Sequence, residues 1–401
     1  MATSCPPTID IEGLGLDQGA LLLIRQALAG VPEEAELRVL GQSPDWDLHL
    51  RVWCRSQGHG LRLEAGADGR LIAVVTRHGQ AQGRWRGALP TGEAAAIPAA
   101  QADPAWGLAA RGAFVEASAP PFNFALRQRH QLWAETAAEL YAQGAAAQWD
   151  PATAIDWQAP FELAPSLEAA VVQLMSYLVE NENAALLVPA RHLAQIHPHY
   201  REVMQLLALQ CADEARHVEV FTRRAQLRGG APVLSTAGAQ ASLQSLFEAS
   251  DFSSASFLLA VLGEGTFVNL LNFLHAYGPD PVTRQIARLA AIDEARHVAF
   301  GMAHLAYRLG VEPSYQSQLR NAIETRFDAL ASSAGLNEEV FDALQLLAAG
   351  ECSVGALALG HARVQQLKRE MLDGRRARLL RLGFERTEAE RLASMHTRNF
   401  M

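Results

Sequence analysis

Residues 213–217 read Asp-Glu-Ala-Arg-His, and residues 293–297 repeat the same five letters. In each copy the glutamate and the histidine are three positions apart, so a helix places both side chains on one face, where they can reach the same ion. One such pair is ordinary, because a lone buried histidine is more often a hydrogen-bonded core residue than a ligand. Two copies in one chain favour a metal site.

Each copy is preceded by one acidic residue on an otherwise apolar helix. Glu182 precedes Glu214 by 32 positions, and Glu264 precedes Glu294 by 30. Turn signals rich in proline lie midway, at 197–199 and at 277–281. Each arm is therefore about 15 residues, or roughly 22 Å at 1.5 Å per residue. Two equal arms return the chain to the same height, so the sequence predicts two helical hairpins with their acidic residues at one level.

The sequence leaves two candidates for the first ligand residue, Glu180 and Glu182. Glu180 lies two positions before Glu182, and a helix turns their side chains about 200° apart, so only one can face the centre. Glu182 is preferred because it shares its face with Met175 and Leu178, whereas Glu180 lies among more polar side chains.

Two such hairpins packed together surround one centre with carboxylates and imidazoles. This ligand set is the one found in ferritin-like dimetal bundles. Carboxylate and imidazole suit iron and manganese, so we expect two Fe ions or a Mn/Fe pair. Four carboxylates also balance two divalent cations, which reduces the cost of burying the centre. The predicted ligands are Glu182, Glu214, His217, Glu264, Glu294 and His297.

Residues 173–305 resemble the di-iron carboxylate oxidases and oxygenases, which include ribonucleotide reductase small subunits, bacterial multicomponent monooxygenases and arylamine N-oxygenases. The resemblance implies that Asp213 and Asp293 orient the ligand histidines. Arg216 and Arg296 match paired arginines of the monooxygenases, although a surface ion pair with a neighbouring helix explains them equally well. Ala290 stands where the N-oxygenases have a third histidine, which argues against N-oxygenation.

The first part of the chain mixes strand and helix patterns, unlike the helical remainder. Residues 8–78 alternate strand and helix patterns in the order βαβαββ, and the segment 13–19 aligns with the opening motif of SirA/TusA-like sulfur carriers. The resemblance implies that fold, but Leu16 occupies the position of the family's sulfur-carrying cysteine. Residues 79–122 are rich in Gly, Ala and Pro and are interpreted as a linker. Residues 123–401 are expected to form a mainly α, ferritin-like four-helix bundle with extra C-terminal helices.

Composition narrows the function classes. The 401 residues carry a net charge of −9, which argues against nucleic-acid binding. The 4 cysteines lack any paired spacing, and neither a secretory signal nor a run of about 18 apolar residues is evident, so we expect a cytoplasmic protein without a membrane span. The basic run at 375–378 is interpreted as a solvated helix face. His304, with three other histidines, is interpreted as a polar residue at a turn or helix end.

These features predict a dimetal oxidase or monooxygenase that uses O2 on a small organic substrate. No fused reductase is evident, so electrons would come from an external donor. Phe267, Val268 and Leu271 either line a substrate cavity or belong to the core. Two alternatives stay open: an iron-handling protein without an organic substrate, and a scaffold or regulatory protein whose sulfur-carrier-like domain docks a protein partner.

Overall fold

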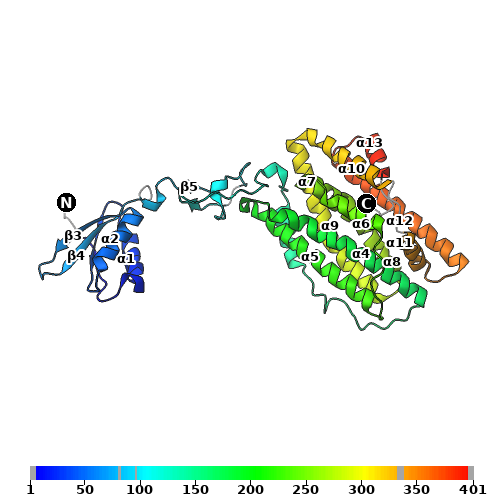
Figure 1. Ribbon diagram of the computed structural model, residues 1–401, viewed down its shortest axis with the longest axis horizontal. Coiled ribbons are helices and arrows are strands. Elements are labelled where there is room, and N and C mark those ends of the chain that lie inside the picture. Colours follow the sequence, from blue (N-terminus) through cyan, green and yellow to red (C-terminus); the bar gives the residue numbers. More distant parts are fainter. Residues whose placement is uncertain (1–5, 80–82, 95–96, 332–337, 396–401) are drawn as a thin grey trace. The chain divides into compact units, whose positions relative to one another are not determined.

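The computed structural model describes residues 6–79, 83–94, 97–331 and 338–395. The chain divides into two compact units. The first contains Met1–Ile97 and Asp103–Asn123, and the second contains Pro98–Ala102 and Phe124–Met401. Figure 1 shows a small sheet with helices in the first unit and a large helical assembly in the second.

The first unit is built on a four-stranded sheet whose strands lie in the order β1-β2-β4-β3. β1 and β2 are parallel, and the other neighbours are antiparallel. The chain order is strand, helix, strand, helix, strand, strand, as the sequence predicts. The elements are β1 (Thr8–Asp10), α1 (Ala20–Ala29), β2 (Glu36–Leu40), α2 (Trp46–Gln57), β3 (Gly60–Ala65) and β4 (Leu71–Thr76).

One core joins both helices of this unit to the sheet. Ile24 of α1, Leu50 of α2 and Val75 of β4 are all fully buried within it. Leu16 also belongs to this core and is only 5% exposed. The side chain at this position therefore serves packing. The later part of the unit adds a short antiparallel pair, β5 (Leu89–Pro90) and β6 (Phe114–Val115).

The second unit is organised around two helical hairpins, shown in green and yellow in Figure 1. The first hairpin joins α4 (Pro165–Leu193) to α5 (Arg201–Gln226). The second joins a helix that starts as α7 (Phe252–Ser256) and continues through η6 (Phe257–Glu264) and α8 (Gly265–Tyr277) to α9 (Pro281–Val311). The turns fall where the sequence predicts them, because proline cannot continue a helix but fits its first turn.

Helix capping and one buried ion-pair network fix the far end of the bundle. Asp280 caps α9 by accepting a hydrogen bond from Thr283 N at 2.8 Å. Arg224 of α5 is fully buried and pairs with Asp280 at 2.8 Å and with Glu168 of α4 at 2.7 Å. Both hairpins are therefore joined at this end, and each buried charge has a partner.

Further helices surround the four of the bundle and cover it. The last long one, α12, buries an i, i+3/i+4 stripe of side chains in which Arg375 lies between Met371 and Leu379. Arg375 is only 2% exposed, so the prediction of a solvated face at 375–378 is wrong for this residue. The additional helices are α3 (Ala137–Ala146), α6 (Ala237–Phe247), α10 (Gln316–Ala331), α11 (Glu338–Ala349), α12 (Val354–Arg381) and α13 (Arg386–Ser394).

By length and composition, the continuous helix Phe252–Tyr277 would be able to cross a membrane, which the sequence analysis did not expect. However, 83% of its apolar window is buried inside the protein. The helix also contains Glu264, which is 4% exposed. Its apolar character thus fits a core helix of the bundle. The bent pair α11 and α12 passes the same test only if its 113° bend is ignored.

His304 lies inside α9 and is fully buried, so its interpretation as a residue at a turn or helix end is wrong. Its Nδ1 donates to the Trp133 carbonyl at 3.0 Å, and its Nε2 accepts from the Ser253 hydroxyl at 2.9 Å. Both contacts suit the neutral ring. Burial is the main cause that lowers the pKa of His304 to about 4.

This environment predicts a loss of stability in mild acid. The unfolded chain binds a proton at His304 near pH 6.5, whereas the folded protein resists it until about pH 4. The contribution of neutral His304 to the free energy of unfolding is fully present above the unfolded-state pKa and falls by about 2 kcal/mol by pH 5. We expect the difference in unfolding free energy between pH 7.5 and pH 5 to shrink in His304→Gln. His361 is exposed, so in the matched variant His361→Gln this difference in unfolding free energy should equal that of the parent. The same difference in His304→Gln and His361→Gln would contradict the role of buried, neutral His304.

Candidate metal centre

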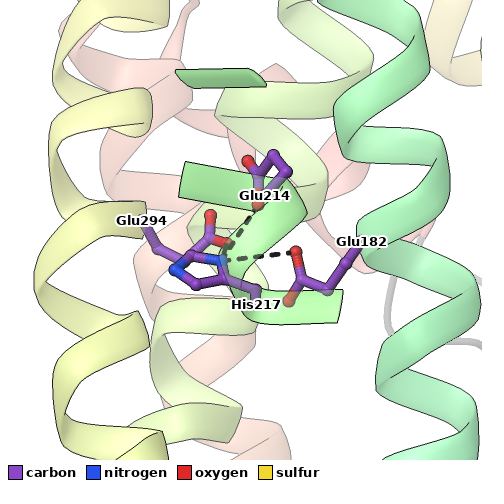
Figure 2. Close-up of side chains that lie close together, drawn as sticks. All are labelled: Glu182, Glu214, His217 and Glu294. Atoms are coloured by element: carbon purple, nitrogen blue, oxygen red, sulfur yellow. Dashed lines mark hydrogen bonds and ion pairs between the residues drawn. The ribbon is translucent and has the colours of Figure 1, made fainter. Parts of the chain in front are cut away.

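All six predicted ligand residues lie together at the middle of the bundle. Glu182 comes from α4, Glu214 and His217 from α5, Glu264 from the end of η6, and Glu294 and His297 from α9. Each is at most 4% exposed. Figure 2 shows Glu182 of α4, Glu214 and His217 of α5, and Glu294 of α9 pointing toward one another.

The donor atoms form two overlapping groups. Glu182, Glu214, His217 and Glu294 make one group, and Glu214, Glu264, Glu294 and His297 make the other; within each, the ligand atoms lie within 4.8 Å of one another. The two glutamates from the DEARH repeats belong to both groups. A carboxylate has two oxygens, so these residues have the chemistry to bridge two ions.

The imidazoles present their Nδ1 atoms to this cluster. His217 Nδ1 lies 3.0 Å from a Glu214 oxygen and 3.5 Å from a Glu294 oxygen. His297 Nδ1 lies 3.0 Å from the other Glu214 oxygen and 3.5 Å from Glu294. The arrangement repeats around Glu214, so both halves of the sequence meet at one point.

Several of these donor atoms are buried without a hydrogen-bond partner among the described residues. Burying a polar atom in this way is costly unless something else satisfies it. A pair of divalent cations fits both the unsatisfied oxygens and the negative charge of four glutamates. The atoms are Glu182 Oε1, Glu214 Oε1, Glu264 Oε2, Glu294 Oε2 and His297 Nδ1. His297 Nδ1 and Glu214 Oε1 lie 3.0 Å apart, but they are not aligned as a hydrogen bond.

Glu264 reaches the centre from a π-helical segment. Residues Phe257–Glu264 are wound as a π-helix, and Gly263 and Gly265 flank the glutamate. Such segments are rare, and they are frequently found at functional sites because they redirect the side chains that follow. Gln210 Nε2 donates to Glu264 Oε1 at 3.0 Å, which leaves the other oxygen facing the cluster.

The aspartates of the two repeats hold the histidines crosswise. His217 Nε2 lies 3.3 Å from Asp293, and His297 Nε2 lies 3.3 Å from Asp213. An imidazole that donates its outer N–H to a carboxylate keeps the inner nitrogen directed at a metal. Each repeat therefore orients the histidine of the other.

The two arginines of the repeats close this network. Arg216 donates to Asp213 and, at 3.0 Å, to Asp293. Arg296 donates to Asp293 and, at 3.1 Å, to Asp213. Both arginines are 9% exposed, so they are internal groups, and the alternative of a simple surface ion pair does not describe them.

Two neighbouring residues that the sequence analysis missed support the same network. Gln148 donates to Asp213 at 2.8 Å, and the indole N–H of Trp149 donates to Asp293 at 2.8 Å. The Trp149 ring also stacks on His217, with 6.4 Å between centroids. Both lie after α3, far from the repeats in sequence, and no local pattern marks them.

In the absence of cations, the crowded charges of the cluster shift the pKa values of its glutamates and histidines. Burial, followed by repulsion from neighbouring glutamates, raises the pKa of Glu182 and Glu264 well above the usual range. Burial opposes protonation of His217 and His297, yet the surrounding carboxylates raise the pKa of both well above the usual value. Burial acts to raise the pKa of Glu214. The attraction of His297 and His217 is stronger, so the net effect is a pKa below the usual range. Without cations, the raised pKa values favour binding of protons by Glu182, Glu264 and the two histidines.

The other residues named from the sequence lie outside the cluster or at its edge. Glu180 is half-buried and belongs to neither ligand group. Phe267 borders a cavity of about 20 Å³ that Glu182, Glu264 and Glu294 also line, and this volume holds roughly one water. Leu271 is a core residue, and Val268 is partly buried.

Solved structures of an R2-like ligand-binding oxidase are similar to this chain. One variant with an aerobically reconstituted Mn/Fe cofactor shows 19% identity, a TM-score of 0.46, and coverage of 64% of this chain and 94% of the other. The structure described as having an aerobically reconstituted metal cofactor after photoconversion shows 19% identity and a TM-score of 0.45 over 65% and 90%. No protein-family model and no curated protein match the chain. Similarity at this level does not assign the chain to a family.

The crossed aspartates lead to a prediction about metal affinity. Asp213→Asn and Asp293→Asn keep the side-chain size but weaken the contact that orients His297 or His217. We expect each variant to bind Mn(II) or anaerobic Fe(II) about 10–100-fold more weakly than the parent in a chelator competition. Glu180→Gln, outside the cluster, should bind like the parent. Parental affinity in both asparagine variants would show that the crossed contacts do not support metal binding.

Proposed function

We propose that this chain is a dimetal oxidase or monooxygenase that holds two Fe ions, or a Mn/Fe pair, between its two hairpins and oxidises a small organic substrate with O2. The observation that supports this most is the pair of buried ligand groups that share Glu214 and Glu294. A carboxylate-rich site with few imidazoles suits redox-active iron and manganese. Its symmetry across the two repeats fits two ions better than one.

When bound, the metal pair supplies the electrons that O2 requires. The protein supplies the surroundings. Asp213 and Asp293 keep the outer imidazole protons in place, and Gln210 fixes one oxygen of Glu264. The apolar side chains of Leu246 and Phe267 border the adjacent cavity and limit the access of water.

The first unit is assigned a docking role in this proposal. Its element order supports the SirA/TusA-like interpretation, but buried Leu16 provides no thiol for sulfur transfer. Leu22 of α1 and Val52 of α2 are 59% and 63% exposed, which gives this unit apolar side chains for a partner protein. An external electron donor is one partner that the proposed chemistry requires.

One observation favours the second candidate, an iron-handling protein. The cavity that borders the glutamates measures only about 20 Å³, so an organic molecule does not fit beside them in this conformation. Such a protein would take up Fe(II) and oxidise it with O2 or peroxide, without an organic substrate.

Oxygen consumption by the full-length protein separates the two functions. After anaerobic loading with about two Fe(II) per chain, the protein is mixed with O2 and then given a chemical reductant. An oxidase should consume O2 in repeated cycles while its iron content stays at about two per chain. An iron-handling protein should instead consume O2 only as further Fe(II) is added, and its iron content should rise.

The controls for this experiment come from the bundle itself. Glu264→Ala removes a buried donor and should abolish O2 consumption above that of free iron, whereas Glu180→Ala should leave it unchanged. Bound iron that never reacts with O2 in the parent protein would exclude both functions.

A further inference from the structure

Two buried arginines and one partly buried arginine gather on one side of the second unit. Arg375 and Arg378 come from α12, and Arg326 comes from α10. Arg375 is 2% exposed and Arg326 is 7% exposed. The Nε and Nη2 atoms of Arg378 are buried without a hydrogen-bond partner among the described residues.

Among the described residues, Arg375 and Arg378 have no counter-ion. No carboxylate within residues 6–79, 83–94, 97–331 and 338–395 forms an ion pair with either guanidinium, and neither donates a hydrogen bond to these residues. By contrast, the fully buried Arg224 contacts two carboxylates. A buried cation without a partner is costly, so these two groups call for an anion that the described residues do not supply.

The cluster is positively charged at neutral pH. Burial, with smaller contributions from Arg378 and Arg326, lowers the pKa of Arg375 to about 9. Burial lowers the pKa of Arg378 to about 10. Both values lie well above neutrality, so the guanidinium groups keep their protons. Because Arg378 and Arg326 both influence Arg375, the three groups lie near one another.

Two glycines make room for one of these guanidinium groups. A Cβ at Gly265 of α8 would lie 2.5 Å from Arg378 Cζ, and a Cβ at Gly374 of α12 would lie 3.2 Å from Arg378 Nη1. Gly265 directly follows Glu264, a proposed metal ligand. The guanidinium therefore packs against the helix backbone next to the metal centre.

A cavity of about 340 Å³ adjoins the third arginine. This size is within the usual range for small-molecule sites. Arg326 contributes to its wall and is thereby common to the cavity and to the arginine cluster. Arg375 and Arg378 do not line the cavity themselves. Its wall also includes Ser245, Leu258, Asn321, Ala322 and Thr325, and one carboxylate, Glu248.

We propose that Arg375 and Arg378, together with Arg326, bind the carboxylate of a small organic acid whose remaining part occupies the cavity between α6 and α10. A guanidinium matches a carboxylate through two parallel hydrogen bonds. An organic acid fits better than an inorganic anion, because Arg375 lies between Met371 and Leu379 and the cavity is partly apolar. This proposal concerns binding alone and does not depend on metal at the dimetal centre.

Binding of benzoate to the full-length protein tests the proposal, with benzamide as the neutral isostere and sulfate as the inorganic anion. Calorimetry and thermal unfolding are compared for the parent, Arg375→Met, Arg378→Met and Arg376→Met. Arg376 is the matched control, since it is exposed and pairs with Asp373 at 3.0 Å. If Arg375→Met does not fold, Arg378→Gln takes its place.

We expect benzoate, but neither benzamide nor sulfate, to bind the parent and Arg376→Met and to raise their Tm. In Arg375→Met and Arg378→Met the affinity for benzoate should fall about tenfold or more. Without ligand, both variants should unfold at or above the parental Tm, because each loses an unpaired buried charge. Equal benzoate binding in all four proteins, no binding to the parent, or binding of sulfate alone would overturn the proposal. A lower Tm with unchanged benzoate binding would show a purely structural role.

Discussion

Mutual repulsion among buried carboxylates is the constraint on which the rest of the second unit depends. Four glutamates and two aspartates meet inside the bundle, and among the described residues the fixed positive charges in contact with them are those of Arg216 and Arg296. Two divalent cations would balance the remaining negative charge while the histidines stay neutral. Without cations the same balance requires protons, which agrees with the raised pKa values of both histidines and of Glu182 and Glu264.

The architecture distributes this charge over two hairpins that depend on each other. Each DEARH repeat supplies a glutamate to both ligand groups and an aspartate to the histidine of the opposite repeat. Neither hairpin completes the site alone, so closure of the bundle and assembly of the centre are one event. At the far end, Arg224 and Asp280 join the hairpins through a buried pair. The covering helices then exclude solvent from a centre that needs a dry environment.

The grouping of these six residues is predictable from the sequence because the pattern that indicates it is local and repeated. The i, i+3 spacing, the near-equal arms and the turns at proline placed six residues at one level, and the structure brings those six together. The preference for Glu182 over Glu180 followed from burial on an apolar face, and only Glu182 lies in a ligand group. That these residues bind metal stays a proposal.

Residues whose role depends on distant partners were missed or misread. Gln148 and Trp149 reach the aspartates from a loop, and only the tertiary fold brings them there. Arg375 was assigned to a solvated face because its neighbours are charged, yet the stripe from Met371 to Leu379 turns it inward. The sequence pattern favours a turn or helix end for His304, although α9 continues beyond it. In each case the local pattern is compatible with two environments, and long-range packing decides between them.

Metal content per chain after loading with Fe(II) or Mn(II) is the most direct test of the central claim, measured on the parent and on Glu214→Ala and Glu294→Ala. Because these glutamates belong to both ligand groups, the account predicts about two ions per parental chain and loss of both ions in either variant. A parent that remains free of metal, or variants that retain both ions, would contradict it.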